Sequence, residues 1–121
     1  MVIAALSLTL DGPKRKQVVR SLRASSGPTR VEPGCLDCRV MEEVDDPSHV
    51  LYFELWETTE QLVAWLQSKR YRHVLAAMEE SVASPQLQFF WVSDVKGIEF
   101  LEASRLNETE PQPAPENASG G

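Results

Sequence analysis

Residues 49–56 constrain the fold more than any other part of this 121-residue sequence. Consecutive side chains of a β-strand point to opposite faces of its sheet, so a strand with one face in water carries one polar set. In residues 49–56 both sets are apolar: Val50, Tyr52 and Trp56 on one side, and Leu51, Phe53 and Leu55 on the other. Residues 87–95 show the same two-sided pattern. These two strands therefore need protein packed on both faces of their sheet.

The order of the remaining patterns predicts an α+β fold. Residues 2–10 and 35–44 alternate between apolar and polar side chains, as strands do. Residues 13–25 carry a narrow apolar stripe and are predicted to form a helix that stops at Ser26-Gly27-Pro28. A second helical stretch runs from Leu62 to Val82, with an interruption at Ser68. The sum is βαββαβ, a ferredoxin-like antiparallel sheet with helices on one face.

The uncovered face of that sheet predicts a homodimer. The sequence has no further elements to cover this face, so we expect the sheet of an identical subunit to do so. The folded domain is predicted to span residues 1–103, with residues 98–101 as a short strand or helix that docks on the core or on the partner. Residues 104–121, an acidic tail that contains proline and glycine, are predicted to be disordered because they offer few apolar side chains to bury.

Composition excludes several classes of function. Twelve Lys and Arg against 18 Asp and Glu give a net charge of -6, which argues against a nucleic-acid partner. No run approaches the ~18 apolar residues of a membrane span. Two cysteines are too few to stabilise a domain of this size by disulfide bonds. The apolar residues at the N-terminus lack the basic residues and the cleavage site of a secretion signal. The sequence therefore predicts a cytoplasmic protein without a membrane partner.

Residues 14–30 form a basic segment in this acidic chain. Six basic residues and no acidic ones occur there: Lys14, Arg15, Lys16, Arg20, Arg23 and Arg30. One interpretation is a solvated helix face, and the other is a surface for an anionic partner or a phosphate-bearing ligand. The sequence leaves both open.

Short motifs give a resemblance to a known family. They are Pro33-Gly34-Cys35-Leu36, the pair Asp46-Pro47, the strand end Glu54-Leu55-Trp56-Glu57, and Trp65-Leu66-x-Ser68-x-x-Tyr71. Over roughly residues 2–103 the chain resembles the antibiotic biosynthesis monooxygenase family. The resemblance implies a dimeric α/β barrel. For the cofactor-free branch of the family it implies a monooxygenase that oxidises an aromatic quinol or polyphenol with O2, without metal, flavin or haem.

The resemblance also implies a site. Trp65 and Tyr71 fall where the cofactor-free branch carries a pocket tryptophan and tyrosine, so both are predicted as catalytic residues, and Gln61 stands where an asparagine is found. An apolar pocket for a small aromatic substrate is expected between helices and sheet, lined by Gln61, Phe53, Trp56, Met78, Phe89 and Phe90. Leu6 and Leu75 occupy the positions of the residues that bind haem in the haem-degrading branch, so that activity is disfavoured. The alternative to an enzyme is a non-catalytic dimeric module that binds a small hydrophobic ligand or a partner protein.

The histidines and cysteines do not point to a metal site. His73 is turned by about 200° from Tyr71 on a helix, so we expect it in water, opposite the apolar face. His49 lies beside a turn and is expected at the surface. Cys35 and Cys38 begin a strand, where residues three apart point to opposite faces, so no zinc or redox pair is predicted.

Overall fold

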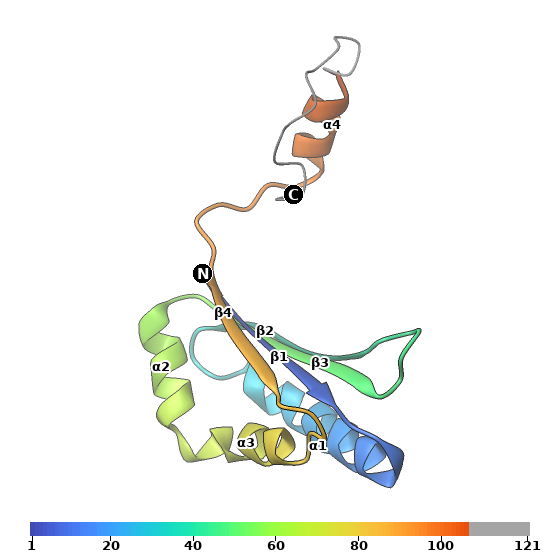
Figure 1. Cartoon of the computed structure of the whole chain (residues 1–121). Helices are drawn as coiled ribbons and strands as arrows, with labels where there is room; N and C mark the ends of the chain where they lie inside the picture. The colour runs from blue at the N-terminus through green and yellow to red at the C-terminus, as the bar shows by residue number, and fades with distance from the viewer. Residues whose placement is uncertain (107–121) are drawn as a thin grey trace.

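The computed structural model describes residues 1–106 and confirms the predicted ferredoxin-like βαββαβ fold. The strands are β1 (Val2–Thr9), β2 (Cys35–Glu42), β3 (His49–Trp56) and β4 (Gln86–Trp91). They form one antiparallel sheet in the order β2-β3-β1-β4. The helices α1 (Gly12–Arg30), α2 (Thr59–Gln67) and α3 (Arg72–Glu79) lie together on one face of it (Figure 1).

Alternation along β1 and β3 decides which side chains enter the core. Val2, Leu6 and Leu8 are buried, and their partners on β3 in the antiparallel register, including Tyr52 opposite Leu6, are buried as well. Side chains of the helices complete this core. They are Val18, Val19 and Leu22 of α1, and Leu62, Trp65 and Val74 of the later helices. The even-numbered side chains of β1 and β3 therefore face the helices.

The first helix is longer than the sequence predicts. It continues through Ser26-Gly27-Pro28 to Arg30, although Pro28 cannot donate a hydrogen bond to the preceding turn. Hydroxyl groups satisfy carbonyls there: Ser25 donates to Leu22 O (3.0 Å), and Thr29 to Ser25 O (2.8 Å). Thr29 is also buried. The predicted stop at residue 25 is wrong, since the helix continues to Arg30 with Ser26 and Thr29 buried against the core.

The predicted interruption at Ser68 is confirmed. Thr58 caps α2 by accepting a hydrogen bond from the backbone of Gln61 (3.2 Å). The helix ends at Gln67, and the Ser68 hydroxyl donates to the Trp65 carbonyl (2.8 Å). A 3-10 turn, η1 (Lys69–Tyr71), then leads into α3. The break lets Trp65 and Tyr71, from different helical segments, both reach the core.

Beyond Trp91 the chain leaves the sheet. The last strand ends four residues earlier than predicted, and α4 (Ile98–Leu106) follows as a helix with no buried residue. It stands apart from the sheet (Figure 1), so residues 98–101 do not dock on the core. The domain boundary at residue 103 stays a prediction, and residues 107–121 of the predicted tail lie outside the described residues. No helix in residues 1–106 has the length and apolar character needed to cross a membrane.

The sheet face opposite the helices is apolar and uncovered within residues 1–106. Leu51 is 38% exposed and Phe90 is 47% exposed, and Phe53 and Leu55 between them are half-buried. This face is where the two-sided strand pattern requires a second layer, which residues 1–106 of one chain do not provide.

Candidate active site

A buried carboxyl group lies at the centre of the helix-covered face. Glu54 is fully buried, and it receives hydrogen bonds from three aromatic side chains. Trp56 Nε1 donates to Oε1 and Trp65 Nε1 donates to Oε2, each at 3.0 Å. The Tyr52 hydroxyl also donates to Oε2. This network joins β3 to α2 and fixes the orientation of both indole rings.

The sequence analysis missed Glu54, although a signal was present. The residue belongs to the same alternating set as Tyr52 and Trp56, which was recognised as apolar and buried. A carboxyl group in such a set must find hydrogen-bond donors, and Tyr and Trp are side chains that carry both an apolar body and a donor. Two of its three donors, Tyr52 and Trp56, stand two residues before and two residues after Glu54 in the sequence.

Trp65 and Tyr71 form an aromatic pair beside this network. Their ring centroids lie 5.9 Å apart in an edge-to-face arrangement, and Trp56 stacks obliquely on Trp65 at 5.7 Å. Burial, together with the nearby Glu54, raises the pKa of Tyr71 to about 12. The Tyr71 hydroxyl therefore stays protonated, and it makes no hydrogen bond within residues 1–106. It is a free donor, whereas the Trp65 N–H is already engaged by Glu54.

The Pro33-Gly34 turn holds Gln61 against the site. Gly34 has φ +86°, and a Cβ there would lie 2.1 Å from Gln61 Oε1. Only glycine fits, both in conformation and in space. Gln61 Oε1 also accepts a hydrogen bond from the Thr58 hydroxyl (3.1 Å), so the side chain is fixed between the turn and the start of α2.

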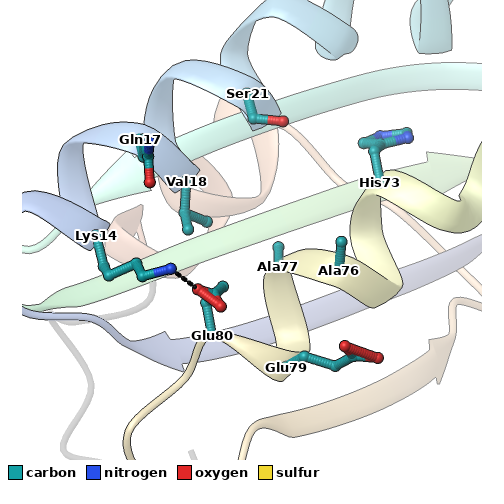
Figure 2. A pocket seen from close by; sticks show the side chains of 9 residues that line it. All are labelled: Lys14, Gln17, Val18, Ser21, His73, Ala76, Ala77, Glu79 and Glu80. Atoms are coloured by element: carbon teal, nitrogen blue, oxygen red, sulfur yellow. Dashed lines mark ion pairs between the residues drawn. The ribbon is translucent and has the colours of Figure 1, made fainter.

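Two hollows share Trp65, and a larger groove continues from them. The Trp65 hollow, of about 170 Å³, is lined by Glu32, Pro33, Trp56, Gln61, Ala64, Trp65 and Arg70. The bridging hollow, of about 210 Å³, is lined by Ser25, Pro28, Thr29, Glu32, Trp65, Arg70 and His73. The α1–α3 groove, of about 490 Å³, is lined by the nine residues labelled in Figure 2, among them His73. His73 thus joins the groove to the bridging hollow.

The prediction that His73 lies in water is wrong, because the side chain is half-buried. Its ring packs edge-on against Trp65, with centroids 6.1 Å apart, because the break at Ser68 turns α3 relative to α2. Nδ1 lies 2.6 Å from the Arg70 carbonyl oxygen, which can only accept, so Nδ1 carries a hydrogen. Nε2 is buried and has no hydrogen-bond partner within residues 1–106. In the neutral ring this nitrogen is an unused proton acceptor.

Comparison with protein families identifies the chain. Residues 1–86 match the family model described as antibiotic biosynthesis monooxygenase. The chain belongs to this family. The protein named "putative antibiotic biosynthesis monooxygenase" from Deinococcus radiodurans has a similar structure, with a TM-score of 0.73 and 20% identity over 80% of this chain and 97% of that one.

Other solved structures agree on the fold. A protein named antibiotic biosynthesis monooxygenase matches with a TM-score of 0.68 and 18% identity, over 78% of this chain and all (100%) of its own. Rv0793 from Mycobacterium tuberculosis matches with a TM-score of 0.65 and 20% identity, over 80% of this chain and 100% of its own. No curated protein matches the sequence. At these identities the likeness establishes the architecture of the family and not a substrate.

The structure of this family member brings some predicted site residues together and separates others. Gln61, Trp56 and Trp65 line one hollow. Met78 and Phe89 pack, half-buried, against the same core. Phe53 and Phe90 lie on the opposite face of the sheet, because their register partners Ala5 and Ile3 belong to the outward set of β1. They do not line a cavity with Trp65 within one chain.

The two cysteines lie on the same side of β2, against the sequence prediction. A β-bulge between Cys35 and Asp37 shifts the register by one residue. Both thiols therefore pack against the core, with Cys38 fully buried and donating to the Tyr52 oxygen (3.4 Å). Burial raises the pKa of Cys35 to about 12 and that of Cys38 to about 11.

These pKa values predict inert thiols. The thiolate is the reactive form, and a pKa of about 11 or 12 leaves it scarce at pH 8. We expect both cysteines of the folded protein to react with a thiol-specific disulfide reagent at least about a hundredfold more slowly than in urea. A colorimetric thiol assay in the two conditions measures this ratio. Fast labelling of one thiol in the folded protein would contradict the burial of that side chain.

One group of metal-ligating side chains occurs within residues 1–106, away from Trp65. Atoms of Glu43, Asp46 and His49 lie within 4.8 Å of one another at the β2–β3 turn. Two of the three have protein partners outside the group: Ser48 donates its amide and hydroxyl to Asp46, and His49 Nε2 hydrogen-bonds to the Ser7 hydroxyl (3.0 Å). His49 is half-buried by this contact. We assign no metal to these residues.

Proposed function

We propose that this family member is a cofactor-independent monooxygenase that oxidises an aromatic quinol or polyphenol-like substrate with O2. In such a reaction a deprotonated, electron-rich ring reduces dioxygen directly. One oxygen atom enters the product, the other leaves as water, and the substrate supplies the electrons. The protein must remove a proton, bind the resulting anion and exclude water.

The residues around Trp65 offer these functions. The Trp65 ring provides an aromatic wall, and Gln61 beside it is fixed well enough to orient a substrate hydroxyl. Tyr71 has a free hydroxyl that would donate to the phenolate oxygen. Trp65 would contribute its ring face only, since its N–H is bound to Glu54.

The unpartnered nitrogen of His73 is the observation that carries this proposal. The Arg70 carbonyl fixes the tautomer, so Nε2 of the neutral ring is free to accept the substrate proton. His73 lines both the bridging hollow, which it shares with Trp65, and the α1–α3 groove. The groove, at about 490 Å³, is in the size range of small-molecule sites.

Oxygen uptake tests the proposal. With a panel of quinols and anthrone-like phenols, we expect uptake by the metal-stripped protein above the uncatalysed rate. His73→Gln is expected to lower the rate by about 10²–10⁴-fold, the usual contribution of a general base. Tyr71→Phe should reduce the rate with little change in Tm, because its hydroxyl supports no bond in the fold.

His49→Gln is the matched control, and it should keep the full rate. Full activity of His73→Gln would remove His73 from the mechanism while leaving the oxygenase intact. No uptake with any substrate of the panel would favour the rival function, a dimeric module that binds a small hydrophobic ligand or a partner protein. The burial of Trp65 and Tyr71, at 4% and 7% exposure, is the observation that favours this rival.

We further propose that the protein is a homodimer in the cytoplasm, with the sheets of two subunits facing each other. The uncovered apolar face around Phe53 and Leu55 supports the dimer. The free thiols of Cys35 and Cys38 fit a reducing compartment.

A further inference from the structure

Three arginines converge on one hollow at the edge of the sheet. Arg23 and Arg30 come from α1, and Arg39 comes from the edge strand β2. With Ser26, Val40 and Met41 they line a hollow of about 270 Å³. The chain as a whole carries a net charge of -6, so its composition does not explain this concentration of positive charge. Three guanidinium groups repel one another unless a negative group lies among them.

Asp37 compensates only part of this charge. Its Oδ2 accepts a hydrogen bond from Arg39 Nε (2.7 Å), and its Oδ1 lies 3.8 Å from Arg30 Nε. The hydrogen bond from Arg39 holds the pKa of Asp37 below its usual range, so the carboxylate is ionised at neutral pH. Three positive charges and one negative charge leave +2. No acidic residue lines the hollow itself.

Two of the three guanidinium groups are held through Nε, which leaves their terminal donors free. Arg30 Nε donates to the Cys38 carbonyl (3.0 Å), and Arg39 is held through Nε by Asp37. Within residues 1–106 their terminal amino groups donate no hydrogen bond, and the guanidinium of Arg23 has no partner. Oriented guanidinium groups with free terminal N–H bonds match the oxygens of a phosphate group in bidentate pairs.

We propose that this hollow binds a phosphate group, either as free phosphate or on a small monoester. A phosphate monoester carries a charge of about -1.5 to -2 at pH 7, which matches the residual +2. Val40 and Met41, consecutive residues of β2, add apolar atoms to the lining that would suit the group bearing the phosphate. None of the lining residues lines the Trp65 hollow, the bridging hollow or the α1–α3 groove, so the proposal is independent of the proposed oxygenase.

Calorimetric titration with inorganic phosphate and with phenyl phosphate, at constant ionic strength, tests the site. We expect saturable binding with one site per chain, and binding at least about tenfold weaker in Arg23→Gln and in Arg39→Gln. Tighter binding of phenyl phosphate would identify a monoester as the ligand, and equal binding would identify the phosphate group alone. Arg23 is exposed and has no partner, so its variant should melt like the wild type.

Lys16→Gln is the charge-matched control, because Lys16 lies on the same helix but outside the hollow. It should change the affinity for phosphate less than twofold. Equal weakening by Lys16→Gln and Arg23→Gln would show general charge screening and overturn the proposal. Binding of succinate as tight as that of phosphate, or no saturable heat at all, would also overturn it.

Discussion

Replacing Glu54 with glutamine is expected to lower the free energy of unfolding by about 2–4 kcal/mol, with a fall in Tm of roughly 10–25 °C. The carboxyl group accepts from Tyr52, Trp56 and Trp65 in a site without water access. An amide has one acceptor oxygen, so its NH2 group would face at least one buried donor. Each buried donor left without a partner costs about 1–3 kcal/mol. Urea unfolding followed by tryptophan fluorescence measures the change.

Glu79→Gln is the control for this substitution. Glu79 is exposed and forms no ion pair within residues 1–106, so its variant should lie within about 0.5 kcal/mol of the wild type. Glu54→Leu should also destabilise the fold, because it leaves all three donors unpaired. A Glu54→Gln protein that unfolds at the wild-type urea concentration would mean that the three hydrogen bonds contribute nothing net to stability.

Leu55→Glu is expected to convert the protein from a dimer to a monomer at micromolar concentration. Leu55 lies on the uncovered sheet face, opposite Ile3 on one neighbouring strand and Asp37 on the other. A carboxylate there loses its hydration between two apolar sheets and faces another carboxylate instead of a cation, which costs several kcal/mol per subunit. Size-exclusion chromatography with light scattering should give the mass of two chains for the wild type and of one chain for the variant.

Val63→Glu serves as the comparison for the dimer. Val63 is exposed on α2, on the helical side of the sheet, so the same charge there should leave two chains associated. A wild-type protein with the mass of a single chain would refute the interpretation of the two-sided strands. Dissociation of both variants to the same extent would mean that net charge, and not the sheet face, controls association.

The strand pattern was the strongest information in the sequence. Alternation predicted β3 with its observed bounds, and it predicted a strand over residues 2–10, where β1 lies. The break at Ser68 was also confirmed. These features are local, because a two-residue period, a capping hydroxyl or a turn needs only its neighbours.

Errors arose where backbone geometry departs from the regular period. The bulge in β2 brought Cys35 and Cys38 to one face, and the turn at η1 carried His73 against Trp65. The helix α1 continued past Pro28 to Arg30, with Ser26 and Thr29 buried against the core. A prediction that assumes a constant helical or strand period along the chain cannot include these local changes of the backbone.

The sequence by itself determined the order of the elements, the ferredoxin-like fold and the two apolar faces of the sheet. Tertiary structure alone decided that Tyr71 and His73 pack against Trp65, which donates to the buried Glu54, and that Arg23, Arg30 and Arg39 share one hollow. The reason is physical: element order follows from patterns that each segment carries, whereas a site depends on side chains far apart in sequence that packing brings within hydrogen-bonding distance.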